Sequence, residues 1–297
     1  MTTIRNLETE QSIPLYADLD VSSTSEILRL MNQADQSVPI AVERVLDTVA
    51  RGVELIVDTL SHGGRLIYIG AGTSGRLGVL DAVECLPTFN IPPDRILGII
   101  AGGERAMFRA VEEAEDQAIS AHEDLASVDL QAGDIVVGVS ASGRTKYVAG
   151  GLSYAHSVGA RTISISCNRD AEMSRLAEVA IEIDTGPEVL AGSTRLKAGT
   201  AEKLVLNMLS TASMIRMGKT YRNMMVDMRV TNEKLFDRAV GIVMRIGQVE
   251  QQVAEQALHE ANGQVKHAVL MVRKSVGYET AAHMLVAANG VLRAALG

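Results

Sequence analysis

The stretch from Arg65 to Pro87, RLIYIGAGTSGRLGVLDAVECLP, says most about the fold of this chain. A short apolar strand, Leu66–Ile69, runs into a turn rich in glycine and hydroxyl groups, Gly70–Gly75, and a helix follows at once. At such a helix start the backbone N–H groups are unpaired and the helix dipole favours negative charge. The stretch therefore predicts a strand–turn–helix unit with an anion site, in which the helix ends at Pro87.

Further apolar runs of strand length follow, with helical patterns between them: Ile96–Ala101, Ile135–Val139, Thr162–Ser166 and Val179–Ile183. Strands that alternate with helices form a parallel sheet with helices on both faces. We therefore expect an α/β fold built on a five-stranded parallel sheet. In such sheets the ligand lies beyond the carboxyl ends of the strands.

Helical patterns flank this α/β region on both sides. Ser23 and Glu26 have the spacing of a capping box, and a long helical pattern follows Pro39 to about Leu60. From about residue 221 the pattern is helical throughout, with Asn232 as a helix cap. We expect three parts: an N-terminal helical segment over 1–50, an α/β domain over 51–220 and a small helical domain over 221–297.

Composition excludes several classes of protein. The net charge of −8 argues against a nucleic-acid-binding domain, which normally presents a basic face. Cys85 and Cys167 are the two cysteines, and they lack the spacing of a metal site or a disulfide framework, which indicates a reducing, cytoplasmic location. The polar N-terminus lacks the apolar core of a signal peptide, and no apolar run is long enough to cross a bilayer. We expect no metal, nucleic acid or membrane partner.

The first loop contains the pattern Gly70-x-Gly72-x-x-Gly75, which also occurs in dinucleotide sites. A dinucleotide site needs an acidic residue about 20 residues on to bind the ribose, whereas Glu104 lies much further along the chain. Thr73 and Ser74 instead supply hydroxyl groups that suit sugar or phosphate oxygens. The loop therefore favours a sugar phosphate over a dinucleotide.

The second loop, Ser140–Thr145, directly follows the third strand and opens a helix. Its three hydroxyl groups, on Ser140, Ser142 and Thr145, converge with Gly143 on one place, where they suit a single anion. An ordinary helix cap is the alternative, because serine and threonine favour helix starts. There are more hydroxyl groups than one cap needs, which favours phosphate.

A third loop, 186–197, contains Lys197 just before a strong helical pattern. A contact with the ligand would explain a lysine at this position, and capping together with surface charge is the alternative explanation.

Two glutamates are candidates for acid–base chemistry. Glu84 falls on the same helix face as Leu77 and Leu80, so we expect it to face inward, where desolvation raises the pKa of a carboxyl group toward the useful range. The alternative is that Glu84 points to water. On the next expected helix, about 104–125, Glu115 lies closest of four acidic residues to the apolar face, which runs through Met107, Ala110, Val111, Ala114 and Ala118.

Taken together, these segments resemble the N-acetylmuramic acid 6-phosphate etherase family over nearly the whole chain, most loosely in the C-terminal seventy or so residues. The matching segments are Val38–Glu43, Gly70–Gly78, Asp81–Cys85, Ala101–Glu104, Val111–Asp116, Ser142–Thr145, Ser164–Asn168, Lys197–Thr200, Met225–Asp227 and Thr231–Lys234. Leu86 departs from the family pattern, which often has proline there.

The resemblance implies a sugar isomerase (SIS) domain, a three-layer sandwich that binds phosphosugars, followed by a small helical domain. It implies a homodimer that cleaves the lactyl ether of N-acetylmuramic acid 6-phosphate without a cofactor. Glu84 and Glu115 take the positions of the family's two catalytic carboxylates. The remaining expected contacts are with the 6-phosphate, from Ser140, Ser142, Gly143 and Thr145, and with the sugar, from Thr73 and Ser74.

Two other functions are compatible with the same fold. A phosphosugar aldose–ketose isomerase also removes a C2 proton, but it releases no lactate. A phosphosugar-sensing regulator needs neither Glu84 nor Glu115 for chemistry. A DNA-binding regulator would carry a basic arm, whereas the N-terminal region here is acidic.

Overall fold

The computed structural model describes residues 6–297, which form two compact units. The first unit extends to Ala82 and resumes over Asp94–Ser210, and the second comprises Val83–Pro93 and Thr211–Gly297. Two helices, α4 (Gly72–Phe89) and α8 (Lys197–Arg216), contribute residues to both units. The division into three parts at residues 50 and 220 stays a prediction.

A five-stranded parallel sheet lies at the centre of the first unit, as the sequence predicted. Its spatial order is β2-β1-β3-β4-β5, with strands β1 (Leu66–Gly70), β2 (Ile96–Ile100), β3 (Ile135–Val139), β4 (Arg161–Ser166) and β5 (Val179–Glu182). Gly70, the last residue of β1, pairs with Ile100 on one side and with Val139 on the other. The loops after these three strands therefore leave the sheet at the same edge.

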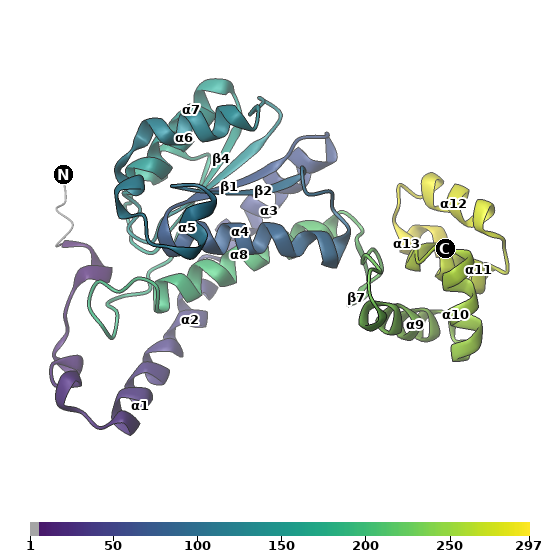
Figure 1. Ribbon diagram of the computed structural model, residues 1–297, viewed down its shortest axis with the longest axis horizontal. Coiled ribbons are helices and arrows are strands. Elements are labelled where there is room, and N and C mark those ends of the chain that lie inside the picture. The colour runs from purple at the N-terminus through teal and green to yellow at the C-terminus, as the bar shows by residue number, and fades with distance from the viewer. Residues whose placement is uncertain (1–5) are drawn as a thin grey trace. The chain divides into compact units, whose positions relative to one another are not determined.

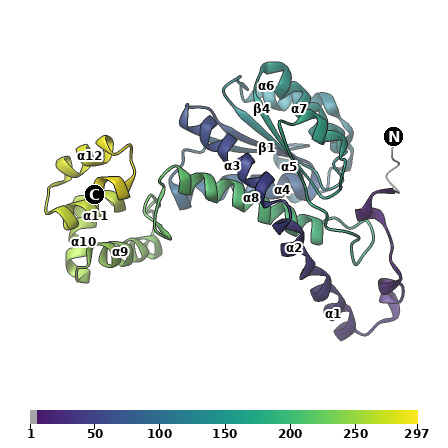
Figure 2. The same cartoon turned by 180° about the vertical axis from the view of Figure 1, so that it is seen from behind.

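Helices cover both faces of the sheet (Figures 1 and 2). On one face α6 (Ala118–Ser127) and α7 (Lys146–Val158) form a core with Ile67 and Val136. On the other face α3 (Leu46–Ser61), α4 and α8 pack against side chains that point the opposite way, such as Tyr68. The core is aliphatic because strands of a parallel sheet are buried on both sides.

The turn from β1 into α4 depends on two glycines. A Cβ atom at Gly70 would lie 2.7 Å from the Gly75 nitrogen, and one at Gly75 would lie 2.6 Å from the Gly70 oxygen. Both distances are too short for real atoms, so only glycine allows the strand and the helix to approach this closely. Gly72 has a φ of 53°, which is also a conformation that favours glycine.

The N-terminal segment consists of short 3₁₀ turns (Glu8–Glu10, Pro14–Tyr16 and Leu19–Val21) and two helices, α1 (Thr24–Asp35) and α2 (Ser37–Glu43). The predicted capping box at Ser23 and Glu26 is confirmed. The expected helix start after Pro39 is wrong: Pro39 lies in the first turn of α2, where a missing N–H costs nothing. A break at Val45 separates α2 from α3.

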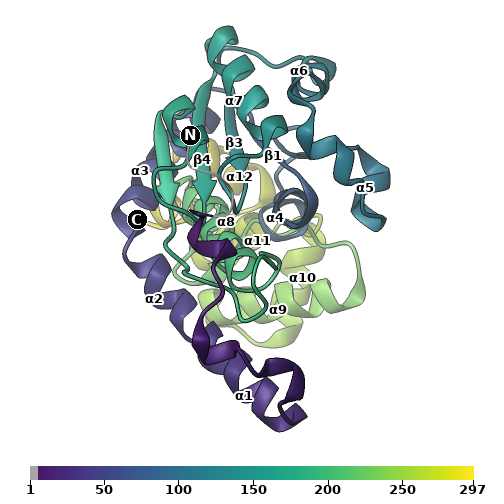
Figure 3. The same ribbon diagram turned by 90° about the vertical axis from the view of Figure 1, so that its left-hand side faces the viewer.

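The start of the described chain is held against loops at the sheet edge (Figure 3). Thr9 is fully buried, and its Oγ1 accepts a hydrogen bond from Asn168 Nδ2 at 3.1 Å. Its carbonyl oxygen accepts another from the Gly192 nitrogen at 3.2 Å. These contacts join the N-terminal segment to the loops that follow β4 and β5.

The single helix expected over 104–125 is wrong. The structure has α5 (Glu104–Phe108), a 3₁₀ turn (Glu112–Asp116) and α6 instead. Arg76 on α4 explains the break, because its guanidinium group donates to the carbonyl oxygens of Ala106 at 2.7 Å and Met107 at 3.1 Å. Because the helix is broken, the expected apolar face does not form, and Ala110 and Ala118, which belong to it, are both exposed.

The expected end of α4 at Pro87 is also wrong, because the helix continues to Phe89. Proline removes one hydrogen bond donor from a helix, and near a C-terminus this loss is limited to one bond. The next turn is still completed, because the Asn90 nitrogen donates to the Leu86 oxygen at 2.9 Å. Pro87 therefore lies inside the last turn and does not end the helix.

The second unit is mostly helical, as predicted. It contains a two-stranded pair, β6 (Thr220–Tyr221) and β7 (Met224–Met225), and helices α9 (Glu233–Gly247), α10 (Gln251–Glu260), α11 (Val265–Lys274), α12 (Tyr278–Ala287) and α13 (Leu292–Leu296). Asn232 caps α9, since its Oδ1 accepts from the Leu235 nitrogen at 2.9 Å. The unit has its own apolar core, which includes Val243, Leu258 and Val269.

Candidate functional site

Three hydroxyl groups meet in the loop after β3. Ser140 Oγ lies 2.8 Å from Thr145 Oγ1 and 3.3 Å from Ser142 Oγ, and it accepts a hydrogen bond from the Gly143 nitrogen at 3.2 Å. The structure thus brings together the four residues that the sequence assigned to one anion. Hydroxyl and N–H groups at the start of a helix, here α7, are suitable donors for a phosphate.

The shape of this loop is fixed by its neighbours. Gly143 has a φ of 69°, and a Cβ atom there would overlap the side chain of Ala171. The Ser140 nitrogen donates to the Ile165 oxygen at 3.0 Å, and the Gly143 oxygen accepts from the Met173 nitrogen at 3.2 Å. The loop is therefore held by β4 and by the segment that follows it.

Arg144 is the cation that the sequence places in this loop. Its guanidinium nitrogen Nη2 lies 3.1 Å from Glu172 Oε1, and its side chain is 17% exposed. Part of its charge is therefore balanced by Glu172, so the neutral donors Ser140, Ser142 and Thr145 are the main groups that the loop offers to an anion.

The first loop presents its two hydroxyl groups differently. Thr73 is half-buried, and its methyl group lies close to Gly199 at the start of α8. Ser74 is buried, and its Oγ lies 2.8 Å from Oε1 of Glu202 on α8. The Ser74 hydroxyl is therefore hydrogen-bonded to the protein interior, which the sequence did not predict.

Glu202 is a buried carboxyl group that sequence reasoning missed. It is fully buried, and this burial raises its pKa to about 8, against the opposing effect of the Ser74 hydrogen bond. Its Oε2 atom has no hydrogen bond partner among residues 6–297. The sequence pattern does indicate a buried glutamate here. Ala198, Glu202 and Val205 fall on one apolar face of the helix, where an acidic residue is unexpected.

A second buried carboxyl group, Asp81 on α4, has a structural role. It accepts hydrogen bonds from Tyr68 at 3.0 Å, Asn207 at 2.8 Å and Ser210 at 3.1 Å. Burial raises its pKa, and these donors act in the opposite direction. Asp81 therefore ties α4 to β1 and α8.

The two candidate catalytic glutamates are both exposed. Glu84 lies on α4 and Glu115 in the 3₁₀ turn before α6. The expectation that Glu84 shares a buried face with Leu80 is wrong, because Leu80 is itself 46% exposed. Both carboxylates are accessible to a ligand, and their catalytic roles stay predictions.

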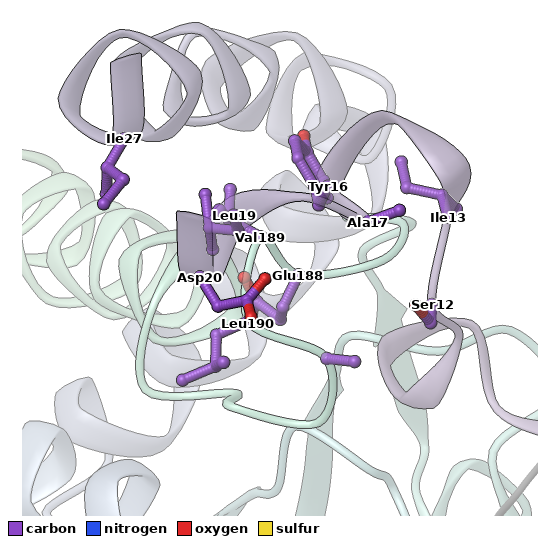
Figure 4. Close-up of a pocket in the computed structure, with 11 residues that line it drawn as sticks. Ser12, Ile13, Tyr16, Ala17, Leu19, Asp20, Ile27, Glu188, Val189 and Leu190 are labelled. Atoms are coloured by element: carbon purple, nitrogen blue, oxygen red, sulfur yellow. The ribbon is translucent and has the colours of Figure 1, made fainter. Parts of the chain in front are cut away.

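The third loop lies against the N-terminal segment, and a cavity of about 430 Å³ separates them (Figure 4). Glu188 caps α8, because its carboxylate accepts from the nitrogens of Lys197 and Ala198, each at 3.0 Å. The Lys197 ammonium group is buried and donates to the Thr185 oxygen at 2.7 Å. The Lys197 side chain is therefore bonded inside the protein, and the surface-charge explanation is wrong.

Two features are absent from the described residues, 6–297: a metal-binding cluster and a membrane-spanning helix. No group of three or more histidine, cysteine, aspartate or glutamate side chains is arranged to hold a metal ion. No helix in this range combines the length and the apolar character that a membrane span requires.

Comparison with known proteins first shows the class of protein to which the chain belongs. Residues 110–212 match the SIS domain, and residues 48–156 match the N-terminal SIS domain of glucokinase regulatory protein. Residues 222–290 match the C-terminal lid domain of the same protein. A phosphoheptose isomerase from Francisella tularensis has a similar fold, with a TM-score of 0.52 and 14% identity, over 65% of this chain and 100% of that one. The chain is a SIS-domain protein with a C-terminal helical domain.

Relatives that match over nearly the whole chain show the family to which it belongs. The chain is 54% identical to an N-acetylmuramic acid 6-phosphate etherase of Mycolicibacterium smegmatis, over 98% of each chain. It is 51% identical to one from a Geobacillus species, over 99% of each chain. The chain belongs to the N-acetylmuramic acid 6-phosphate etherase family.

Proposed function

We propose that the chain cleaves the D-lactyl ether of N-acetylmuramic acid 6-phosphate in amino-sugar recycling, and releases N-acetylglucosamine 6-phosphate and D-lactate. The observation that carries this proposal is the 54% identity to an etherase over 98% of both chains. The hydroxyl cluster after β3 supports it, because the substrate carries a phosphate. The same identity favours the etherase over an isomerase or a sensor.

In the proposed complex Ser140, Ser142 and Thr145 donate hydrogen bonds to the 6-phosphate, together with the backbone of Gly143. The loop is preformed, so binding requires little ordering of these groups. Thr73 and Ser74 lie near the sugar. Neutral donors at a helix start suffice to bind a dianion of this kind.

The proposed reaction is an elimination followed by a hydration. With the sugar ring open, the C1 aldehyde acidifies the C2 proton, which a base removes as the bond from C3 to the lactate oxygen breaks. Glu84 donates a proton to the departing lactate oxygen and then accepts one from the water that adds at C3. Glu115 acts at C2 or in ring opening. General acid–base catalysis supplies typically about 10²–10⁴-fold in rate to each such step.

We also propose that the chain is a cytoplasmic homodimer. Apolar side chains that a single chain leaves exposed support association, and they include Phe108, Val21 and Leu28. Light scattering on the purified protein tests this: a monomeric mass at micromolar concentration would contradict it.

A D-lactate assay with N-acetylmuramic acid 6-phosphate, in the presence of a chelator, tests the activity. We expect equal amounts of D-lactate and N-acetylglucosamine 6-phosphate. Glu84→Gln should lower kcat by at least about 10²-fold while phosphosugar binding is retained. Binding without lactate release by the unaltered protein would favour the sensor or isomerase, and normal turnover by both Glu84→Gln and Glu115→Gln would refute their assignment.

A further inference from the structure

The pair formed by Ser74 and Glu202 is unusual because, within residues 6–297, the carboxyl group has a single hydrogen-bond partner. Glu202 is fully buried, and its Oε1 lies 2.8 Å from Ser74 Oγ. Its Oε2 has no partner in the part of the chain that the structure describes. Ser74 stands in the first turn of α4, inside the loop that we assign to the sugar phosphate.

In the described part of the chain, burial and the Ser74 hydrogen bond are the effects that act on this carboxyl group, and no cation offsets the burial. The titratable neighbour that interacts with it electrostatically is Cys167, in the loop after β4, and the lysines nearest to it on the same helix are Lys197 and Lys203. The two lysines are engaged elsewhere, since Lys197 binds the Thr185 oxygen and Lys203 binds Asn207. The Cys167 thiol is fully buried, and burial, with the nearby Glu202 and Glu188, raises its pKa. The surroundings of Glu202 therefore disfavour a negative charge.

The protonation state of Glu202 decides what Ser74 can do with its own hydrogen. A carboxylate only accepts hydrogen bonds, so it takes the hydrogen of the Ser74 hydroxyl. A carboxylic acid can donate to Ser74 Oγ, and the serine hydrogen is then free to point elsewhere. In that second arrangement Oε2 is a carbonyl oxygen, and leaving it unpaired costs less than leaving a charged oxygen unpaired.

We propose that Glu202 is a positioning residue that acts through Ser74: as a carboxylic acid it donates to Ser74 Oγ, so that Ser74 donates its own hydrogen to an oxygen of the bound sugar phosphate. The inference rests on the proposed function, because it takes the loop after β1 as part of the phosphosugar site. The proposal adds to the site a residue outside that loop, Glu202, which sets the direction in which the Ser74 hydroxyl group donates.

A dependence on pH follows. The pKa of Glu202 is raised to about 8 by burial, so the acid form dominates at neutral pH. Above that value the carboxylate takes back the Ser74 hydrogen, and Ser74 then presents only lone pairs to the ligand. Phosphosugar affinity should therefore fall as the pH rises through about 8. The phosphate itself does not cause this change, since its second pKa is about 6.

The experiment is calorimetric titration of the full chain with N-acetylglucosamine 6-phosphate over about pH 6.5 to 9.5, a range that spans the ionisation of Glu202. For the unaltered protein we expect Kd to rise about threefold to tenfold across it, which is the net worth of one hydrogen bond. Glu202→Gln keeps an N–H donor and cannot ionise, so its Kd should match at pH 7 and stay constant at high pH. Ser74→Ala should bind weakly and independently of pH.

Two further variants separate positioning from stability. Glu202→Ala should weaken binding at pH 7, and it should add nothing in a Ser74→Ala background, because both remove the same interaction. Asp81→Asn is the matched control: this carboxyl group is buried on the same helix as Ser74, but it accepts its hydrogen bonds from Tyr68, Asn207 and Ser210, so the pH dependence should persist. Thermal unfolding at each pH shows which variants are folded.

The inference is overturned if Glu202→Gln keeps the alkaline loss of affinity, or if Ser74→Ala retains it. It is also overturned if the unaltered protein binds equally well throughout the range, or not at all. Failure of the proposed reaction is distinguishable, because it appears as an absence of D-lactate while the binding titrations still follow the expected pattern.

Discussion

Gly143 shows how a single residue shapes the proposed phosphate loop. Its φ of 69° and its contact with Ala171 leave no room for a side chain. We expect Gly143→Ala to cost about 1–3 kcal/mol of stability through backbone strain and to weaken phosphosugar binding at least about tenfold. Gly133→Ala is the control, since nothing lies within 4 Å of its Cβ position and its φ is not positive. Chemical denaturation and phosphosugar titration measure both, and an unchanged Gly143→Ala would contradict the expectation.

At the same scale, the sequence predicted where side chains gather better than where they point. The spacing of Ser140, Ser142 and Thr145 on one short loop was sufficient to place them together, because the loop is local. The direction of Ser74 was not accessible, since it depends on Glu202, which lies far along the chain on another helix. Whether Glu84 faces water was likewise decided by the packing of the whole helix.

Among the elements, Arg65 and Asp134 join the starts of β1 and β3 to the end of α6. Arg65 Nη2 lies 2.6 Å from Asp134 Oδ2, and the same guanidinium group donates to the Val128 and Asp129 oxygens. We expect Arg65→Met to cost about 3–5 kcal/mol, because it leaves Asp134 buried without its cation. Urea denaturation measures this loss, with Arg51→Met, on the exposed face of α3, as the control.

The same pair predicts an acid dependence. Burial alone would raise the pKa of Asp134, but hydrogen bonds from Arg65 and from backbone N–H groups outweigh it and lower the pKa below 3.8. The carboxylate therefore stabilises the fold above pH 3.8, and this contribution is lost as the pH falls through the lowered pKa. Urea denaturation at several pH values should show the difference between the unaltered protein and Asp134→Asn shrinking on acidification. A constant difference would argue against it.

The strands were predicted almost residue by residue, since each is a short apolar run between turn signals. The helix over 104–125 was not, because its break is caused by Arg76, whose side chain reaches over from α4. Local patterns describe local hydrogen bonding. They do not reveal a donor that arrives from another element and competes for the same carbonyl oxygens.

For the molecule as a whole, the two units have separate cores, so damage to one should leave the other folded. Lys266, buried in the second unit, donates to Asp227 at 2.8 Å and to the Gly290 oxygen at 2.7 Å. We expect Lys266→Ala to lower the protection of amides in α9–α11 against hydrogen exchange, with β1, β3 and β4 unchanged. Lys274→Ala, at an exposed position of the same helix, should change neither region. Equal loss of protection in both units would show that they unfold together.

The helical character of the second unit was predictable from the sequence, but which segments of the chain belong to that unit was not. Residues 83–93 lie within the sequence of the α/β region and belong by their contacts to the second unit. No change of composition marks them, because they are the end of one amphipathic helix and the loop after it.

This discontinuity has a consequence for synthesis on the ribosome. The segment Val83–Pro93 leaves the exit tunnel more than a hundred residues before Thr211, where the rest of its unit begins. Domains generally fold as units, starting with the N-terminal one during translation. Here the sheet can form early, whereas the second unit must wait for the end of the chain, and its first piece stays without its final contacts until then. A ribosome that stalls after Pro93 has left the exit tunnel, but before Thr211 has been made, therefore carries a nascent chain in which this piece lacks the rest of its unit.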